Sequence, residues 1–296
     1  MAIYSYLQGG LGNQMFQYAI ARALSEHYQS TFLLDRSWFD MPQSETTPRP
    51  YQLDLLQIQN VANSKFPFPK RPNKLIRTLQ GITSLGPMVY YQQNAFDFDP
   101  SLFQYKNMVK RDLFLFGYWQ AFPYLEKIRP ILQTEFRTKT PAPDHYQTYL
   151  ELIRKSESVM LHIRRGDYVN SPSAAKFHGV LPLSYYQQAI EALLLNEPDA
   201  HFFIFSDDLP WAKEALPKNL NITFVENALR ADAAAQELQL MTQCKHHIIA
   251  NSSLSWWGAW LKPDSNSLVY APNRWISDSS LDLSKLLPAR WNRIPA

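Results

Sequence analysis

The chain has 296 residues, of which 46% are hydrophobic and 19% are charged, and its formal net charge at pH 7 is +3. These proportions are typical of globular proteins and exclude a disordered chain. The small net charge and the lack of any dense run of Lys or Arg argue against a nucleic-acid-binding protein. This length favours two domains, because a domain usually holds roughly 100 to 150 residues.

The cysteine content and the N-terminal residues indicate the cellular compartment in which the protein works. Cys244 is the single cysteine, so no intrachain disulfide can form, which fits a reducing compartment. Glycines interrupt the N-terminal stretch before it reaches the length of a signal peptide or a membrane span. We therefore expect a cytoplasmic protein, free or peripheral to the inner membrane, without stable membrane insertion.

The first residues predict a βαβ unit. Ile3–Leu7 is a short apolar run closed by Gly9-Gly10, and apolar residues then recur at helical spacing from Met15 to Leu24. Thr31–Asp35 has the composition of a second buried strand. A strand, a helix and a further strand in this order predict a parallel sheet.

The rest of the first half is less regular. Prolines break the pattern from Arg36 to about Gly86, where we expect loops and short helices that shape acceptor specificity. Strands are predicted at Met88–Tyr91 and Leu113–Phe116, and a helix with an internal proline at Pro123–Phe136.

A proline-rich segment, Thr138–Tyr146, predicts the linker between a domain of residues 1–143 and one of residues 144–296. Beyond it, strands and helices alternate regularly, which predicts a second doubly wound α/β sheet. The predicted strands are Val159–Ile163, His201–Phe205, Ile222–Val225, His247–Ala250 and Ser267–Tyr270, and the predicted helices are Ser184–Leu195, Trp211–Leu216, Ala233–Gln243 and Leu254–Leu261.

Ligands of parallel α/β sheets bind beyond the carboxyl ends of the strands, so turns from strand to helix are the first candidate sites. The turn GGLGNQMFQYA, Gly9–Ala19, would let backbone N–H groups approach an anion, although a tight structural turn explains its glycines equally well. Its spacing differs from the dinucleotide fingerprint. Asn13 and Gln14 are either helix caps or substrate contacts.

The turn HIRRGDY, His162–Tyr168, places two arginines after an apolar strand. Strand alternation puts Arg164 and Arg165 on opposite faces, so at most one enters the ligand site. Asp167 can satisfy only one of them well, and the other is free to bind phosphate; an internal network of Arg and Asp is the alternative. The string Arg-Gly-Asp within it is common by chance.

Two further turns carry polar groups. Ser206 and Asp207 end a strand in FSDDL, where capping of the next helix explains Ser206 and at least one of the two acids. In ANSSLSWWGAW, residues 250–260, the residues Asn251, Ser252 and Ser253 open a helix, and hydroxyl and N–H groups there suit a diphosphate. Glu237, on the preceding helix, would lie near the same crevice.

We expect no metal site. Asp97-Phe98-Asp99 has the DxD form of metal-dependent glycosyltransferases, but it does not end a buried strand. Cys244, His246 and His247 lack the second ligand pair of a zinc site.

Four segments together resemble the bacterial and animal α-1,2-fucosyltransferases of glycosyltransferase family 11: GGLGNQMFQYA, FGYWQ at 116–120, HIRRGDY, and LMTQCKHHIIANSSLSWWGAWL. The resemblance spans nearly the whole chain in the right order. HxRR is shared with α-1,6- and protein O-fucosyltransferases, whereas GGLGNQ together with SWWGAWL is specific to the α-1,2 family.

The resemblance implies an α/β fold of the GT-B type, in which two Rossmann-like domains face a central cleft and the C-terminal domain holds GDP-fucose. It implies inverting transfer of L-fucose from GDP-β-L-fucose to the 2-hydroxyl of a terminal galactose, with no cofactor or divalent metal. Lactose, N-acetyllactosamine and an O-antigen repeat all remain possible acceptors. The lack of a membrane anchor favours a bacterial enzyme.

The resemblance also implies roles for residues. Arg164 would contact the β-phosphate, and removing such a donor typically costs on the order of 10²- to 10³-fold in rate. His162 and Glu237 would lie near guanosine, while Gly10 and Asn13 would face the reacting sugar. The candidate catalytic residues are Asn13, His162, Arg164 and Asp167, and the candidate GDP-fucose ligands are Gly10, Arg164, Arg165, Ser206, Asp207, Glu237, Asn251, Ser252 and Ser253.

Some questions stay open at the level of sequence. Asp167, His162 and His178 are all conceivable bases for the acceptor hydroxyl, or no strong base is needed. A non-catalytic carbohydrate- or nucleotide-sugar-binding protein and a fucosyltransferase of different linkage are the alternative functions.

Overall fold

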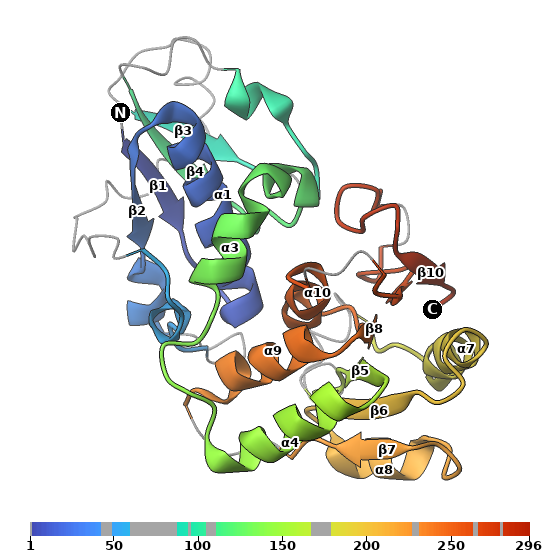
Figure 1. The fold of residues 1–296 in the computed structure, drawn as a ribbon. Coiled ribbons are helices and arrows are strands. Elements are labelled where there is room, and N and C mark those ends of the chain that lie inside the picture. The colour runs from blue at the N-terminus through green and yellow to red at the C-terminus, as the bar shows by residue number, and fades with distance from the viewer. Residues whose placement is uncertain are drawn as a thin grey trace. The chain divides into compact units, whose positions relative to one another are not determined.

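The computed structural model describes residues 2–42, 49–59, 88–93, 96–104, 111–166, 179–226, 231–262, 266–278 and 281–296. Contacts divide the chain into two compact units, one of Met1–Asp54 with Ile58–Glu135 and the other of Leu55–Gln57 with Phe136–Ala296 (Figure 1). The short stretch Leu55–Gln57 belongs to the second unit, where Leu56 pairs with Thr138 in an antiparallel bridge. Each unit is an α/β structure built on a parallel sheet.

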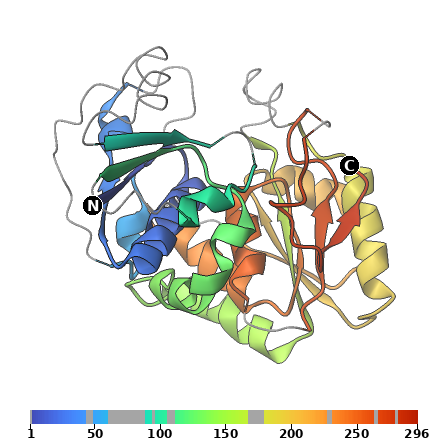
Figure 2. The same cartoon turned by 90° about the horizontal axis from the view of Figure 1, so that it is seen from above.

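The first unit confirms the predicted βαβ start. Its four-stranded sheet, counted over the described residues, has the order β2-β1-β4-β3, and every pair is parallel. Helix α1 connects β1 to β2 and lies along the sheet (Figure 2), where its apolar residues are buried. The elements are β1 (Ala2–Tyr6), α1 (Leu11–Tyr28), β2 (Thr31–Asp35), β3 (Met88–Gln92) and β4 (Asp112–Phe116).

The predicted helix at Pro123–Phe136 is wrong in its extent. The segment forms two 3-10 turns, η5 (Phe122–Tyr124) and η6 (Glu126–Ile128), before α3 (Arg129–Glu135) begins. Pro130 is therefore the second residue of α3, where its missing N–H leaves no hydrogen bond unmade. Elsewhere in the described part of this unit, 3-10 turns include η1 (Ser37–Asp40), η2 (Leu53–Leu55) and η3 (Pro100–Phe103). Most of the predicted acceptor-shaping segment lies outside the described residues.

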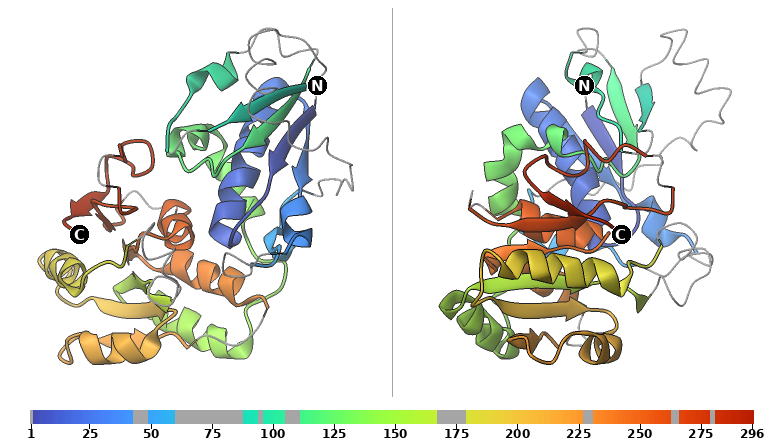
Figure 3. Two further views of the ribbon diagram at one scale, coloured as in Figure 1. Left: turned by 180° about the vertical axis from the view of Figure 1, so that it is seen from behind. Right: turned by 90° about the vertical axis from the view of Figure 1, so that its right-hand side faces the viewer.

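The second unit contains a six-stranded sheet in the described part of the chain, of order β10-β9-β8-β5-β6-β7. Figure 3 shows the ribbon of the chain from two further sides. All its pairs are parallel, as predicted. Its strands are β5 (Ser158–Ile163), β6 (His201–Ser206), β7 (Ile222–Phe224), β8 (His246–Ile248), β9 (Val269–Pro272) and β10 (Asn292–Ile294), and its helices are α4 (Asp144–Lys155), α7 (Leu183–Leu194), α8 (Leu209–Ala215), α9 (Ala233–Gln243) and α10 (Ser253–Trp260).

Helix α4 corrects the predicted linker, because it begins inside Thr138–Tyr146. Pro143 is its N-cap, and Tyr146, Leu150 and Ile153 are buried at helical spacing. Strand β10 was not predicted, since it is a short edge strand with exposed Asn292 and Arg293.

Helices cover both faces of the second sheet. Val159, Leu161 and Ile163 of β5 belong to a core that also contains Tyr185 of α7 and Ala212 of α8. The alternating residues face the other way: Met160 packs near Gly258 of α10, and Gly258 lies so close to Met241 of α9 that an added Cβ would be 2.8 Å from the Met241 Cβ. By the same alternation, His162 lies on the face of β5 that α9 and α10 cover.

Among the helices that the structure describes, none combines the length and the apolar composition that crossing a membrane would require.

Candidate functional site

The central ion pair of the site joins the carboxyl ends of two neighbouring strands. Arg164 follows β5 and Asp207 follows β6, and these strands pair in parallel with Ile163 opposite Ser206. The Arg164 Nη1 lies 3.0 Å from the Asp207 Oδ2. Parallel pairing therefore brings together two residues that are distant in sequence. They lie at the carboxyl ends of the strands, where ligands of such folds bind.

The backbone of the turn after β5 also hydrogen-bonds the Asp207 carboxylate. The Arg165 N–H donates to the Asp207 Oδ1 at 2.8 Å, and the Gly166 N–H also bonds this carboxylate. A Cβ on Gly166 would lie 3.0 Å from the Asp207 Oδ2, so close approach explains the glycine. Burial raises the pKa of Asp207, but the Arg164 guanidinium and the two backbone N–H groups outweigh it and hold the pKa below its usual value. Asp207 is a carboxylate at neutral pH.

Arg165 is tied to helix α8. Its guanidinium lies 4.0 Å from the ring centroid of Trp211, and its Nε is 3.5 Å from the Asp208 Oδ2. Asp208 caps α8 by accepting the Trp211 N–H at 3.2 Å, and Ser206 Oγ accepts the Asp208 N–H at 2.9 Å. Capping thus accounts for one of the two acids, as predicted, but the N-cap of α8 is Asp208 and not Ser206. Sequence reasoning missed Trp211; its only signal was an aromatic residue one turn after the acidic pair.

His162 and Glu237 lie close enough to the pair for its charges to act on their pKa values. His162 is 5% exposed, and its Nδ1 has no hydrogen-bond partner among the described residues. Burial, with a smaller contribution from the charge of Arg164, lowers the pKa of His162 to about 4. Burial raises the pKa of Glu237, on α9, to about 7, although Arg164 opposes this shift. His162 is therefore neutral at pH 7, and Glu237 is close to half protonated.

The start of α10 is held by Asn251. This residue is 2% exposed, and its Nδ2 donates to the carbonyls of Gly179 and Trp275, both at 3.2 Å. Ser252 is the N-cap of α10, and its side chain makes no capping bond. Ser252 and Ser253 are half-buried, so their hydroxyls are the better candidates for a ligand contact in this turn.

In the first unit, Gly10 is the N-cap of α1 and has an extended backbone. Asn13 is half-buried, and its Oδ1 accepts a hydrogen bond from the Gln120 Nε2 at 2.8 Å. Gln14 is buried, and its Nε2 donates to the carbonyls of Gly9 and Pro50. Gln14 therefore holds loops together, whereas Asn13 remains the candidate substrate contact.

Asp167 and His178, both named as possible bases, lie outside the described residues. Their roles stay predictions.

The sequence features discounted as metal sites have local roles. Asp99 is the N-cap of η3, and its Oδ1 accepts the Ser101 N–H at 2.8 Å. Cys244 donates through its Sγ to the Leu240 carbonyl, and His247 Nε2 lies 2.9 Å from the Met241 carbonyl, to which it donates. These groups act within the protein.

Glu157, Glu197 and His246 form a cluster of possible metal ligands. It lies at the opposite ends of the strands, where β5 and β8 begin. The Leu268 N–H donates to the His246 Nδ1 at 3.0 Å, so the ring proton is on Nε2. Nε2 then donates to Glu157 at 3.0 Å, and a metal ion would have to displace this proton. The cluster acts as an internal hydrogen-bond network.

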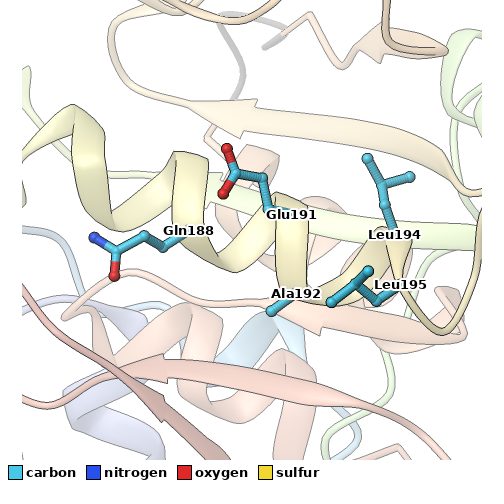
Figure 4. Close-up of a pocket in the computed structure, with 5 residues that line it drawn as sticks. All are labelled: Gln188, Glu191, Ala192, Leu194 and Leu195. Carbon is cyan, nitrogen blue, oxygen red and sulfur yellow. The ribbon is translucent and has the colours of Figure 1, made fainter.

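A shallow hollow lies over α7, lined by Gln188, Glu191, Ala192, Leu194 and Leu195 (Figure 4). All five residues come from one helix and its C-cap, and none is a predicted site residue. The hollow has no convergent polar groups, which a small-molecule site requires.

Comparison with known proteins gives the family. A family model described as glycosyl transferase family 11 matches residues 91–293. The O-antigen biosynthesis glycosyltransferase WbnK of Escherichia coli is 33% identical over 98% of this chain and 99% of its own length. The alpha-1,2-colitosyltransferase of Escherichia coli is also 33% identical, over 99% of this chain and 98% of its own. The solved fucosyltransferase NodZ from Bradyrhizobium shares 15% identity at a TM-score of 0.48, over 88% of this chain and 92% of that one. The chain belongs to glycosyl transferase family 11 and is a glycosyltransferase.

Proposed function

We propose that this protein is an inverting galactoside α-1,2-fucosyltransferase of the GT-B class, which transfers L-fucose from GDP-β-L-fucose to the 2-hydroxyl of a terminal galactose. Family membership and the α-1,2 linkage in the name of one relative support the reaction. The observation that carries the donor assignment is the position of Arg164 at the carboxyl end of β5, where ligands of such sheets bind. The internal network of Arg and Asp is also present, because Arg164 pairs with Asp207 and Arg165 with Asp208.

Arg164 is suited to a diphosphate. A guanidinium has five N–H donors in a planar fork, so it can hold Asp207 on one edge and a phosphate oxygen on another. As the bond between fucose and GDP breaks, negative charge grows on the diphosphate, and a fixed guanidinium stabilises it. The N–H groups and hydroxyls at the start of α10 would add further donors.

The neighbours of Arg164 fit an anionic ligand. His162 is neutral at pH 7. The resemblance implies that Glu237 lies near guanosine, but the charges of Arg164 and Asp207 act on its pKa of about 7, so we propose that Glu237 can hold a proton beside a diphosphate on Arg164. A neutral Glu237 donates a hydrogen bond, whereas a carboxylate there would repel the ligand. Because Arg164 and the helix donors can neutralise the leaving group, we propose that transfer needs no divalent metal.

The acceptor hydroxyl must lose its proton as it attacks the face of fucose opposite GDP. The low pKa of His162 makes it a weak base. Asp167 and His178 therefore remain the candidates for this proton, unless the cation-like fucose reacts without a strong base.

A second candidate donor is GDP-colitose, which the similarity to the alpha-1,2-colitosyltransferase favours. Colitose is the 3-deoxy form of L-fucose, so both donors present the same nucleotide diphosphate to Arg164. The linkage and acceptor chemistry would be unchanged.

A GDP-release assay separates these functions. Purified protein is given GDP-fucose or GDP-colitose with lactose, N-acetyllactosamine or an O-antigen repeat, with and without EDTA. We expect release from GDP-fucose in EDTA, lost in Arg164→Ala and kept in Arg154→Ala, a matched exposed arginine on α4. GDP release from GDP-colitose and not from GDP-fucose would identify GDP-colitose as the donor. No release with any pair would contradict the proposed function.

A further inference from the structure

The segment after β4 turns through two residues with positive φ angles. Gly117 has φ of +138°, and Trp119 has φ of +58° while being fully buried. A Cβ on Gly117 would lie 2.9 Å from the Cβ of Gln93. The left-handed conformation is unfavourable for a residue with a side chain, so it persists only where the surroundings impose it.

Gln93 imposes this turn. Its backbone N–H donates to the Phe116 carbonyl and its Nε2 donates to the Asp97 carbonyl, both at 3.0 Å. Its Oε1 accepts the N–H of Trp119. On the other side of Gln120, the Ala121 N–H donates to the Trp119 carbonyl at 2.8 Å. The backbone is therefore fixed on both sides of Gln120.

From this fixed backbone the Gln120 side chain reaches Asn13. Gln120 is 8% exposed, and its Nε2 donates to the Asn13 Oδ1 at 2.8 Å, across 107 residues of sequence. Because Oδ1 faces Gln120, the Nδ2 of Asn13 lies on the other branch of the amide, beside Gly9. A Cβ on Gly9, which has φ of +78°, would be 2.8 Å from this Nδ2. Within the described residues, no hydrogen bond occupies the Asn13 Nδ2.

We propose that Gln120 is a positioning residue, which orients the Asn13 amide so that its Nδ2–H donors meet an oxygen of the bound sugar. This inference rests on the proposed function and on the role that the family resemblance implies for Asn13, which would face the reacting sugar. Gln120 acts through Asn13 and makes no sugar contact of its own. An amide without this partner is free to turn over and to present its oxygen, an acceptor, where the sugar needs a donor.

The Gln120→Glu variant tests the orientation. A glutamate only accepts hydrogen bonds when ionised, so Asn13 must turn its Nδ2 toward residue 120 and its Oδ1 toward the sugar. Because small misplacements of a substrate contact cost up to about 10²-fold, we expect kcat/KM to fall roughly 10- to 100-fold. The buried carboxylate should also lower the melting temperature, so the variant is assayed well below its melting transition. Gln104→Glu is the matched control, since Gln104 is exposed in the same unit. A rise in KM for GDP-fucose identifies a donor oxygen, and a rise for the galactoside identifies an acceptor oxygen.

A double-mutant cycle with Asn13→Ala distinguishes positioning from a merely structural role. If Gln120 acts through Asn13, Gln120→Glu lowers kcat/KM less than about twofold in the Asn13→Ala background. Independent, multiplicative losses, or full activity of Gln120→Glu in an active enzyme, would overturn this inference and leave the proposed function standing. Absence of wild-type transfer from both donors would remove the proposed function and this inference with it.

Discussion

The Arg164 Nη1 lies 3.0 Å from the Asp207 Oδ2, and the same carboxylate accepts the N–H of Arg165 from the same turn. Asp207 therefore fixes both the backbone after β5 and the guanidinium that this backbone carries. A cation held in this way needs little reorganisation when charge develops on a leaving diphosphate.

Replacement of Arg164 should abolish most of the transfer. We expect Arg164→Ala to lower kcat by roughly 10²- to 10³-fold, because it removes a donor that acts on developing charge. Arg164→Lys should recover only part of this loss, since an ammonium lacks the planar fork. Single-turnover GDP release measures the effect, and near-normal turnover of Arg164→Ala would refute the assignment.

Gly166→Ala should separate the arginine from its partner. The added Cβ would lie 3.0 Å from the Asp207 Oδ2 and 3.1 Å from its Cγ, so the carboxylate must shift. Overpacking of this kind typically costs about 1–3 kcal/mol of unfolding free energy, and we expect activity to fall with it. The melting temperature and kcat should both decrease. If neither changes, the turn tolerates the shifted carboxylate and the prediction is wrong.

Gly10→Ala should leave the fold intact. Gly10 has φ of −75°, and the nearest heavy atom to an added Cβ is 3.8 Å away, at the Arg49 Cδ. If the reacting sugar approaches Gly10 as predicted, the methyl group obstructs it and KM rises while the melting temperature does not change. Unaltered kinetics in a stable variant would place the sugar elsewhere.

Donor binding should weaken as pH rises through about 7. In the folded protein Glu237 releases its proton near that pH, and the resulting carboxylate repels the diphosphate. GDP-fucose is the appropriate probe, because its diphosphate has no terminal phosphate that titrates near pH 6. The Kd of GDP-fucose, measured by calorimetry from pH 6 to 8.5, should increase for the wild type and stay constant for Glu237→Gln. The same pH dependence in both proteins would exclude Glu237 as the group that weakens binding.

The same group should affect stability with a defined sign. The folded pKa of Glu237 is raised from 4.5 to about 7, so the folded state holds the proton more tightly and unfolding free energy falls as pH rises between these values. The full effect is on the order of 3 kcal/mol. Glu237→Gln should therefore gain stability relative to the wild type between pH 5 and pH 8 in urea unfolding, and a constant difference would contradict the raised pKa.

Local sequence patterns predicted much of the fold. Thr31–Asp35 and Ala233–Gln243 have the bounds that the sequence predicts, since each is an uninterrupted apolar or helical pattern with clear ends. Helix α4 was missed because the prolines before Asp144 conceal its start, and they in fact provide its N-cap at Pro143.

The site shows where sequence reasoning stops. The sequence predicted that Arg164 and Asp207 each follow a strand, and the parallel pairing of β5 with β6 brings the two turns together. Sequence reasoning named Asp167 as the partner of one arginine, whereas the structure pairs Arg164 with Asp207 and Arg165 with Asp208. The stacking of Arg165 on Trp211 and the hydrogen bond from Gln120 to Asn13 depend on how distant segments pack, and no local pattern encodes them.

The central claim is tested most directly by the linkage in the product. Protein incubated with GDP-fucose and lactose in EDTA should yield a trisaccharide, whose NMR spectrum shows α-fucose on the 2-oxygen of galactose. A fucosylated product with another linkage or anomeric configuration, or no use of GDP-fucose with any galactoside, would contradict the account.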